Sequence, residues 1–182
     1  CHKYGLYLFL DGARLGYGLA APDNDLTLPE IAALCDVFYI GGTKVGALFG
    51  EAVVIKNPEL AQDFRYLIKQ NGGMLAKGRL LGLQFDALFT DGLYQEISAH
   101  AIAMAEKLRE AFTAKGYNYL APNRTNQIFV IVPDAHLAKI SEQFEYSYDQ
   151  RIDATHSCVR FCTSWATKEE NVDALIRCVE KL

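Results

Sequence analysis

The sequence predicts an α/β fold, in which part of a mostly parallel sheet is followed by a small α+β domain. Residues 6–10 and 37–40 are short apolar runs, and each ends in a loop that contains glycine. Such runs are typical of buried parallel strands. Between them, Thr27 and Glu30 form a capping-box pattern with Pro29 in the first turn, which predicts the start of a helix. A strand, a helix and a strand in this order predict a right-handed βαβ unit.

Three more elements are expected in the first half. Residues 51–55 have the composition of a strand, and Pro58 follows in the turn that ends it. Pro58 then opens a predicted helix that stops near residues 71–73, where two glycines follow an asparagine. Residues 74–82 are mostly apolar and are also expected to be helical.

A long amphipathic helix is expected to join the two halves. Asp91 and Gly92 interrupt the preceding apolar run, and Gly116 is a natural C-cap for a helix over residues 93–115. We expect a domain boundary at this helix, with residues 1–92 as the remainder of a large domain and 93–182 as the linking helix and a small α+β domain. In that second domain the pattern predicts strands over 126–132, 145–148 and 157–164, and helices over 135–143 and 168–181.

Composition excludes several classes of protein. The 182 residues are 51% apolar and 22% charged, which is ordinary for a globular protein. A formal charge of −4 without a basic cluster argues against a nucleic-acid partner, and no apolar run approaches the roughly 20 residues of a membrane span. The five cysteines are scattered and match no zinc spacing, so we expect reduced thiols, no metal and a cytoplasmic location.

Asp11 and Lys44 are the first candidate site residues. Each lies in a glycine loop directly after one of the two predicted parallel strands, so both are expected at the same rim of the sheet. A lysine there can bond covalently to an aldehyde, and a nearby carboxylate can keep a pyridinium nitrogen protonated, as in pyridoxal phosphate (PLP) sites. The alternative is an ordinary Asp-Gly turn and a solvated surface lysine. The joint placement favours the cofactor site.

Four motifs carry a resemblance to a known family. They are the Asp-Gly-Ala-Arg-Leu of residues 11–15, the Gly-Gly-Thr-Lys of 41–44, the Gly-Met-Leu-Ala-Lys-Gly-Arg of 73–79 and the Val-Arg-Phe of 159–161. Together they resemble the PLP-dependent threonine aldolases, of the β-eliminating lyase group of the aspartate-aminotransferase fold (fold type I). The resemblance covers essentially the whole chain. Many members have Ser-Lys-Gly at the lysine loop, where residues 43–45 here are Thr-Lys-Val.

The resemblance implies a fold and a set of roles. The chain would be the C-terminal half of a fold-type-I PLP enzyme that cleaves a β-hydroxy-α-amino acid to glycine and an aldehyde. Lys44 would hold PLP covalently, with Thr43 beside it in the cofactor site. Asp11 would keep the ring nitrogen protonated, and Arg14 would lie near the phenolic oxygen. A homodimer or homotetramer is expected, with an absent upstream half that cradles the phosphate and stacks on the ring.

Three further cations are candidate binding residues. Strand alternation places Arg160 on one face with Cys158 and Cys162, where a buried guanidinium requires an anionic partner. That partner is either a protein carboxylate or the substrate carboxylate, and the resemblance implies the second. Arg79 and Lys77 either reach a phosphate or a neighbouring subunit's pocket, or are solvated ends of a helix. The resemblance favours a pocket role for Arg79.

Other interpretations stay open at this point. Another PLP-dependent β-eliminating lyase or an amino-acid racemase would use the same acid, lysine and arginine. The chain could also be an inactive fragment or a dimerisation unit. Residues 1–5 resemble the last turn of a helix, and few strands are predicted, so we expect that the chain is truncated at its N-terminus.

Overall fold

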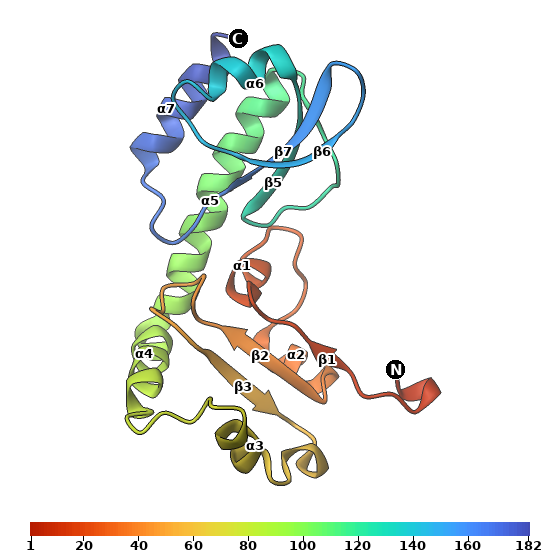
Figure 1. Ribbon diagram of the computed structural model, residues 1–182, viewed down its shortest axis with the longest axis vertical. Coiled ribbons are helices and arrows are strands. Elements are labelled where there is room, and N and C mark those ends of the chain that lie inside the picture. Colours follow the sequence, from red (N-terminus) through yellow and green to blue (C-terminus); the bar gives the residue numbers. More distant parts are fainter. The chain divides into compact units, whose positions relative to one another are not determined.

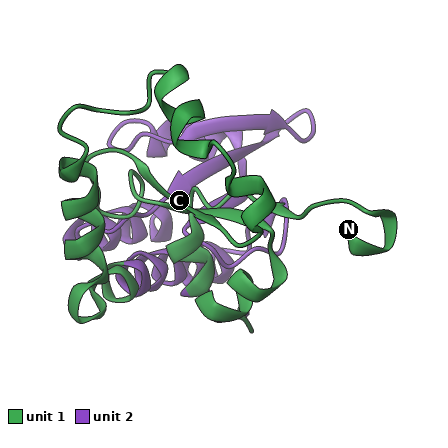
Figure 2. Cartoon of the chain, turned by 90° about the horizontal axis from the view of Figure 1, so that it is seen from below, with its two compact units in different colours: residues 1–19, 24–97 green, residues 20–23, 98–182 purple.

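The computed structural model describes all 182 residues, which form two compact units (Figures 1 and 2). The first unit comprises residues 1–19 and 24–97, and the second comprises residues 20–23 and 98–182. The division at residue 97 falls inside the long helix α5 (Leu93–Ala114). The domain limits expected from the sequence, 1–92 and 93–182, stay a prediction. No helix combines the length and the hydropathy that crossing a membrane requires.

The sheet of the first unit has three strands in the order β1-β2-β3. β1 (Phe9–Leu10) is parallel to β2 (Val37–Gly41), as predicted, although it is shorter than the apolar run that precedes its loop. β3 (Glu51–Ile55) is antiparallel to β2, because residues 42–50 are too few for a parallel crossover, which needs about a dozen. The predicted α/β architecture is therefore confirmed, with one antiparallel strand.

Between β1 and β2, two helices cross from one strand to the other. The capping box at α2 (Leu28–Leu34) is confirmed: the Glu30 carboxylate accepts from the Thr27 N–H at 2.7 Å. The sequence did not predict α1 (Leu15–Leu19), since Gly16 and Gly18 lower helix propensity in this short segment. Contacts with distant residues stabilise α1: the Gly16 N–H donates to the Tyr94 hydroxyl, and the Tyr17 hydroxyl donates to the Lys44 carbonyl.

After β3, the structure corrects two helix predictions. The helix from Pro58 is split into a 3₁₀ turn, η2 (Pro58–Ala61), and α3 (Phe64–Gln70), because Asp63 adopts a left-handed φ of 57° between them. Residues 74–78 are not helical. The next helix, α4 (Arg79–Phe89), begins only after Gly78. A further short 3₁₀ segment, η3 (Thr90–Gly92), joins it to α5.

The second unit is an α+β domain with an antiparallel sheet in the order β4-β5-β7-β6. Its burial alternates residue by residue along β5, which is the pattern expected of a strand with one face on a core. The short strand β4 was not predicted, because two residues carry no periodicity. The elements after α5 are β4 (Asn118–Tyr119), β5 (Gln127–Pro133), α6 (Asp134–Ile140), β6 (Ser147–Arg151), β7 (His156–Cys162) and α7 (Glu169–Glu180).

The core of the second unit lies between this sheet and its three helices (Figure 1). Val130 and Val159 face inward from neighbouring strands and are fully buried, as is Phe112 of α5. Phe161 is also inward, so Arg160 between them projects from the opposite face of the sheet, as the alternation predicted. Fourteen buried residues form this one cluster: Met104, Ala105, Leu108, Phe112, Ile128, Val130, Val132, Leu137, Ile140, Val159, Phe161, Val172, Leu175 and Val179.

Candidate active site

Two glycine loops meet at the carboxyl ends of β1 and β2. The strand register pairs Leu10 with Phe38, so the next residues along each chain, Asp11 and Tyr39, lie beside each other. The Gly41 N–H donates to the Gly12 carbonyl at 2.9 Å, which ties the two loops together. A Cβ atom on Gly12 would lie 1.7 Å from the Tyr39 carbonyl oxygen, so only glycine permits this approach.

Asp11 presents a charged carboxylate at this junction. Its Oδ1 atom accepts hydrogen bonds from the Tyr39 hydroxyl and from the Ala13 N–H, the latter at 3.1 Å. These two donors, together with the positive charge of Lys44, lower the pKa of Asp11 below its ordinary value. The structure thus brings Asp11 and Lys44 within electrostatic range of each other, and it leaves Oδ2 of Asp11 without a hydrogen bond in the chain.

Lys44 has a fixed backbone and an available amine. The N–H groups of Val45 and Ala47 both donate to the Gly42 carbonyl, at 2.9 and 3.0 Å, and close the loop into a compact turn. The buried Tyr17 donates its hydroxyl to the Lys44 carbonyl. The Lys44 side chain itself is exposed and forms no salt bridge within the chain.

Sequence reasoning missed four residues that shape these loops. Besides Tyr17 and Tyr39, the Glu51 carboxylate accepts from the Gly42 N–H at 3.2 Å. The Tyr94 hydroxyl accepts from the Gly16 N–H at 3.0 Å and lies 3.2 Å from the Gly41 carbonyl, to which it donates. Burial raises the pKa of Tyr94 to about 12, so this hydroxyl stays protonated. Only Tyr39 could have been found beforehand, by extending the parallel register one residue past β1.

Arg14 and Thr43 lie in the same two loops. Arg14 is half-buried and Thr43 is exposed, and no hydrogen bond or ion pair of either side chain is formed within the chain. The loops therefore offer one free carboxylate oxygen, one amine and one guanidinium. This set fits PLP, which has a ring nitrogen that can be protonated, an aldehyde carbon and anionic oxygens.

Arg160 belongs to the second unit. Its Nη1 atom donates to the Gln127 side-chain oxygen at 3.4 Å, and the guanidinium lies 5.9 Å from the centroid of the Phe129 ring. It forms no salt bridge with a carboxylate of this chain, so the choice between a protein carboxylate and a substrate carboxylate as its partner stays a prediction. The buried Nε atom has no hydrogen-bond partner within the chain.

Arg79 and Lys77 are exposed at the start of α4 and in the turn before it. The same helix contacts the end of the lysine loop, because the Gln84 side-chain oxygen accepts from the Leu48 N–H at 2.7 Å. Neither cation forms a salt bridge within the chain. The structure does not bring them together with Asp11 and Lys44.

The chain is similar to threonine aldolases in both sequence and structure. No family model matches the chain. It is 31% identical over 179 residues to the low specificity L-threonine aldolase of Pseudomonas sp. (strain NCIMB 10558), covering 96% of this chain and 50% of that protein. It is 42% identical to the threonine aldolase of Leishmania major, with a TM-score of 0.97 over 100% of this chain and 53% of that structure.

A more distant solved structure shows the fold alone. The enzyme SPT, with PLP bound as an internal aldimine, is 15% identical with a TM-score of 0.66, over 99% of this chain and 48% of that one. The resemblance to threonine aldolases and the α/β fold of the fold-type-I enzymes, both predicted from the motifs, are confirmed. The chain spans about half the length of the curated relatives that it matches.

Proposed function

We propose that this chain is part of a PLP-dependent lyase similar to low specificity threonine aldolase, which cleaves a β-hydroxy-α-amino acid to glycine and an aldehyde. The observation that carries the proposal is the meeting of Asp11 and Lys44 on loops at the carboxyl ends of two adjacent parallel strands. Ligands of open α/β sheets bind at this edge. The similarity to threonine aldolases over half of their length supports the choice of reaction.

Four side chains of the first unit would hold the cofactor. Lys44 would bind it covalently through its amine, and Thr43 lies beside it in the loop. Asp11 would face the ring nitrogen, and Arg14 would face the phenolic oxygen. When bound, PLP supplies an electron sink for the pair of electrons released as the Cα–Cβ bond breaks.

The state of Asp11 suits this assignment. Two hydrogen-bond donors lower its pKa, so its carboxylate is anionic at neutral pH. An anion at this point favours a proton on the ring nitrogen, because opposite charges at short range stabilise each other. The unpaired Oδ2 atom is the one that this contact would use.

Arg160 would bind the α-carboxylate of the substrate. One of its nitrogen atoms is engaged by Gln127, whereas Nε is buried without a partner. The free edge of a guanidinium accommodates a carboxylate through two parallel hydrogen bonds, which fixes orientation as well as position. Fixing the carboxylate would orient the bond to be cleaved.

Several remaining assignments belong to the same proposal. Arg79, and less directly Lys77, would contact the cofactor phosphate or the pocket of a neighbouring subunit, in a homodimer or homotetramer. The substrate would be a small amino acid, and the location would be cytoplasmic. The exposure of both cations and the absence of a salt bridge for either are compatible with a partner outside the chain.

Adduct mapping and product analysis test the proposal. The chain is mixed with PLP, reduced with borohydride and digested, and mass spectrometry should place the adduct on Lys44. The enzyme that contains this chain should convert L-threonine to glycine and acetaldehyde. Formation of pyruvate and ammonia from L-serine, without glycine, would indicate a different β-eliminating lyase. Interconversion of the L and D enantiomers alone would indicate a racemase.

A further inference from the structure

The contact between Tyr39 and Asp11 goes beyond the residues needed to hold a cofactor. Phe9, Asp11 and Tyr39 project from the same face of the first sheet, since Phe9 pairs with Val37 and the side chains alternate along both strands. The rings of Phe9 and Tyr39 are in contact, with centroids 6.1 Å apart and planes at 41°. The Tyr39 ring that packs against Phe9 also donates its hydroxyl to the Asp11 carboxylate.

The backbone leaves the pair little freedom to separate. Gly12 passes so close to the Tyr39 carbonyl that no side chain fits, and its own carbonyl is bonded to the Gly41 N–H at 2.9 Å. The Ala13 N–H holds the Asp11 carboxylate from the loop side at 3.1 Å, on the same oxygen that the Tyr39 hydroxyl binds. Both donors therefore act on Oδ1, and the second oxygen remains open.

We propose that Tyr39 is a positioning residue for Asp11: its hydroxyl holds Oδ1 so that Oδ2 is presented to the ligand at the loop junction. The contact itself does not depend on the proposed function. Only the identification of the group that Oδ2 binds as the ring nitrogen of PLP rests on the proposed function. In this arrangement the tyrosine does not touch the cofactor, and it acts through the orientation and the charge of the carboxylate.

The electrostatics agree with the geometry. The hydrogen bond from Tyr39 is the main cause of the lowered pKa of Asp11, and the same bond raises the pKa of Tyr39 to about 12. Two other charged groups act on the pair: Lys44 favours the Asp11 anion, and Glu51 disfavours ionisation of Tyr39. Since both neighbours remain in a Tyr39→Phe variant, the effect of the hydroxyl alone can be separated from theirs.

The first test follows the Asp11 carboxyl carbon by ¹³C NMR during acid titration of the full 182-residue chain, without PLP. Tyr39→Phe keeps the ring against Phe9 but removes the donor, so the pKa of Asp11 should rise toward its ordinary value. The matched control is Tyr7→Phe, which alters another tyrosine of the same segment that is 58% exposed and should leave the Asp11 titration unchanged. An Asp11 titration that is the same in Tyr39→Phe and in the unmodified chain would overturn the proposal.

The reciprocal variant keeps the test decisive if Tyr39→Phe folds poorly. In Asp11→Asn the neutral amide no longer penalises a phenolate, so the pKa of Tyr39 should fall from about 12 toward the ordinary tyrosine value of about 10. The difference in ultraviolet phenolate absorbance between Asp11→Asn and Asp11→Asn with Tyr39→Phe measures this titration, because the other nine tyrosines are common to both chains. A Tyr39 that still titrates near 12 in Asp11→Asn would contradict the contact from its other side.

Addition of PLP separates this inference from the proposed function. If the ring nitrogen pairs with Asp11, PLP should shift the Asp11 carboxyl resonance in the unmodified chain and shift it less in Tyr39→Phe. If PLP leaves that resonance unchanged while Tyr39→Phe still raises the pKa of Asp11, the cofactor assignment fails and the positioning by Tyr39 stands.

Discussion

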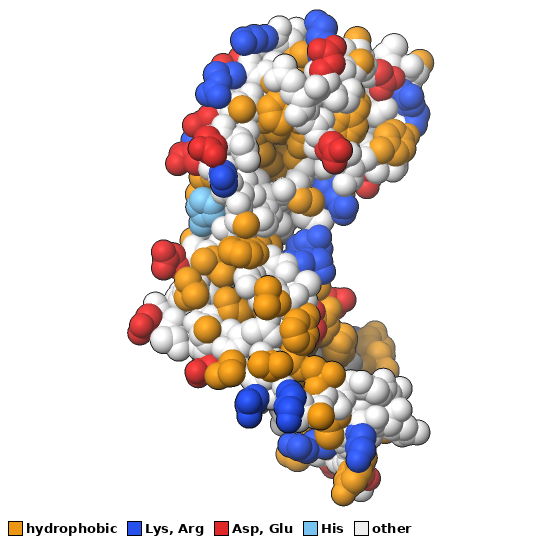
Figure 3. Space-filling view, turned by 60° about the vertical axis from the view of Figure 1, so that its left-hand side comes forward, with side chains coloured by type: hydrophobic (Ala, Val, Ile, Leu, Met, Phe, Trp, Pro, Cys, Tyr) orange, Lys and Arg blue, Asp and Glu red, His pale blue; other side chains and the backbone are white.

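The two units of this chain differ in how completely they bury their apolar side chains. In the second unit, apolar residues from three helices and one sheet face form a single core, and Phe112, Ile128, Val130, Val132 and Val159 are fully buried. In the first unit, large apolar side chains remain exposed on the sheet and on α4, among them Phe9 at 59% and Leu83 at 57%. Figure 3 shows such side chains gathered over the part of the surface that this unit contributes.

This difference has a functional meaning. The first unit carries Asp11 and Lys44, whose loops are joined by backbone hydrogen bonds and by tyrosine hydroxyls. The second unit carries Arg160 on the outer face of a sheet whose inner face is firmly packed. We therefore expect substitutions of the exposed loop residues of the first unit to affect catalysis more than stability, and core substitutions in the second unit to do the reverse.

The largest effect should follow Lys44→Ala in the proposed lyase. Without the amine, the borohydride-reducible lysine–PLP adduct should disappear, and kcat should fall by about 10⁴-fold or more, as is common for residues of covalent catalysis. Mass spectrometry of the reduced protein and steady-state kinetics measure the two outcomes. Lys77→Ala is the control and should keep the adduct. If Lys44→Ala retains one reducible adduct, the bond lies elsewhere, with Lys77 as the next candidate.

The next largest effect concerns the core of the second unit. Phe112 is fully buried, so Phe112→Ala should lower the free energy of unfolding by about 3–5 kcal/mol. Phe9→Ala in the first unit removes an equally large ring that is 59% exposed, and it should change stability by no more than about 0.5 kcal/mol.

Urea unfolding measures this contrast, with far-ultraviolet circular dichroism for the whole chain. Fluorescence of Trp165, the one tryptophan, reports on the second unit. Equal losses of stability in the two variants would remove the proposed difference between the units.

A smaller effect is expected at Arg160. Arg160→Lys keeps the charge but loses the planar pair of donors, so KM for the amino acid should rise by roughly 10- to 100-fold, equivalent to one charged hydrogen bond. The effect on kcat should be smaller. Steady-state kinetics with L-threonine separates the two constants. Gln127→Ala removes the neighbouring acceptor and should give a weaker change of the same kind. A fall in kcat with an unchanged KM would show that Arg160 does not bind the ground-state substrate.

The smallest effect is a pH dependence at the hairpin between β6 and β7. Asp153 accepts hydrogen bonds from the Thr155 N–H at 2.7 Å and from the N–H and ring of His156, and these lower its pKa to about 2. A carboxyl group whose pKa is lowered by folding stabilises the fold at pH values above the pKa that it has in the unfolded chain, near 4. This contribution is lost as the pH falls toward 2. The urea midpoint of the second unit should therefore decrease over this range.

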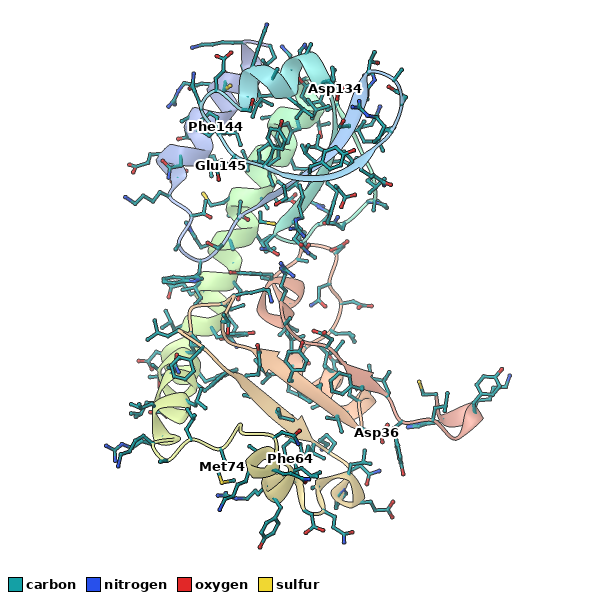
Figure 4. All side chains as sticks on the ribbon, in the orientation of Figure 1. Asp36, Phe64, Met74, Asp134, Phe144 and Glu145 are labelled. Carbon is teal, nitrogen blue, oxygen red and sulfur yellow. The ribbon has the colours of Figure 1, made fainter.

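Asp153→Asn should make that decrease shallower, because the group no longer titrates. Asp134, at the start of α6 (Figure 4), provides a second acid-sensitive contact. It accepts from Arg151 and from the Ser157 hydroxyl. It should keep part of the slope in the variant. An unchanged slope in Asp153→Asn would place the acid sensitivity outside the hairpin.

Much of the fold followed from local patterns. Sequence alone predicts features that depend on residues close together in the chain. They are the capping box at Thr27 and Glu30, the alternation along β5 and β7, and the Gly116 cap after α5. The placement of Asp11 and Lys44 at one rim followed from a topological rule, since parallel strands direct their carboxyl ends the same way.

Tertiary structure decided what depends on distant partners. The Tyr94 hydroxyl reaches Gly16, 78 residues away along the chain, and no spacing in the sequence indicates such a bond. The same holds for Tyr17 at the Lys44 carbonyl and for the unpaired Nε of Arg160. The candidate residues could be named from the sequence, because residue types and strand ends are local properties. How these residues are held depends on hydrogen bonds between loops, and those bonds depend on where the backbone of each loop passes in the folded chain.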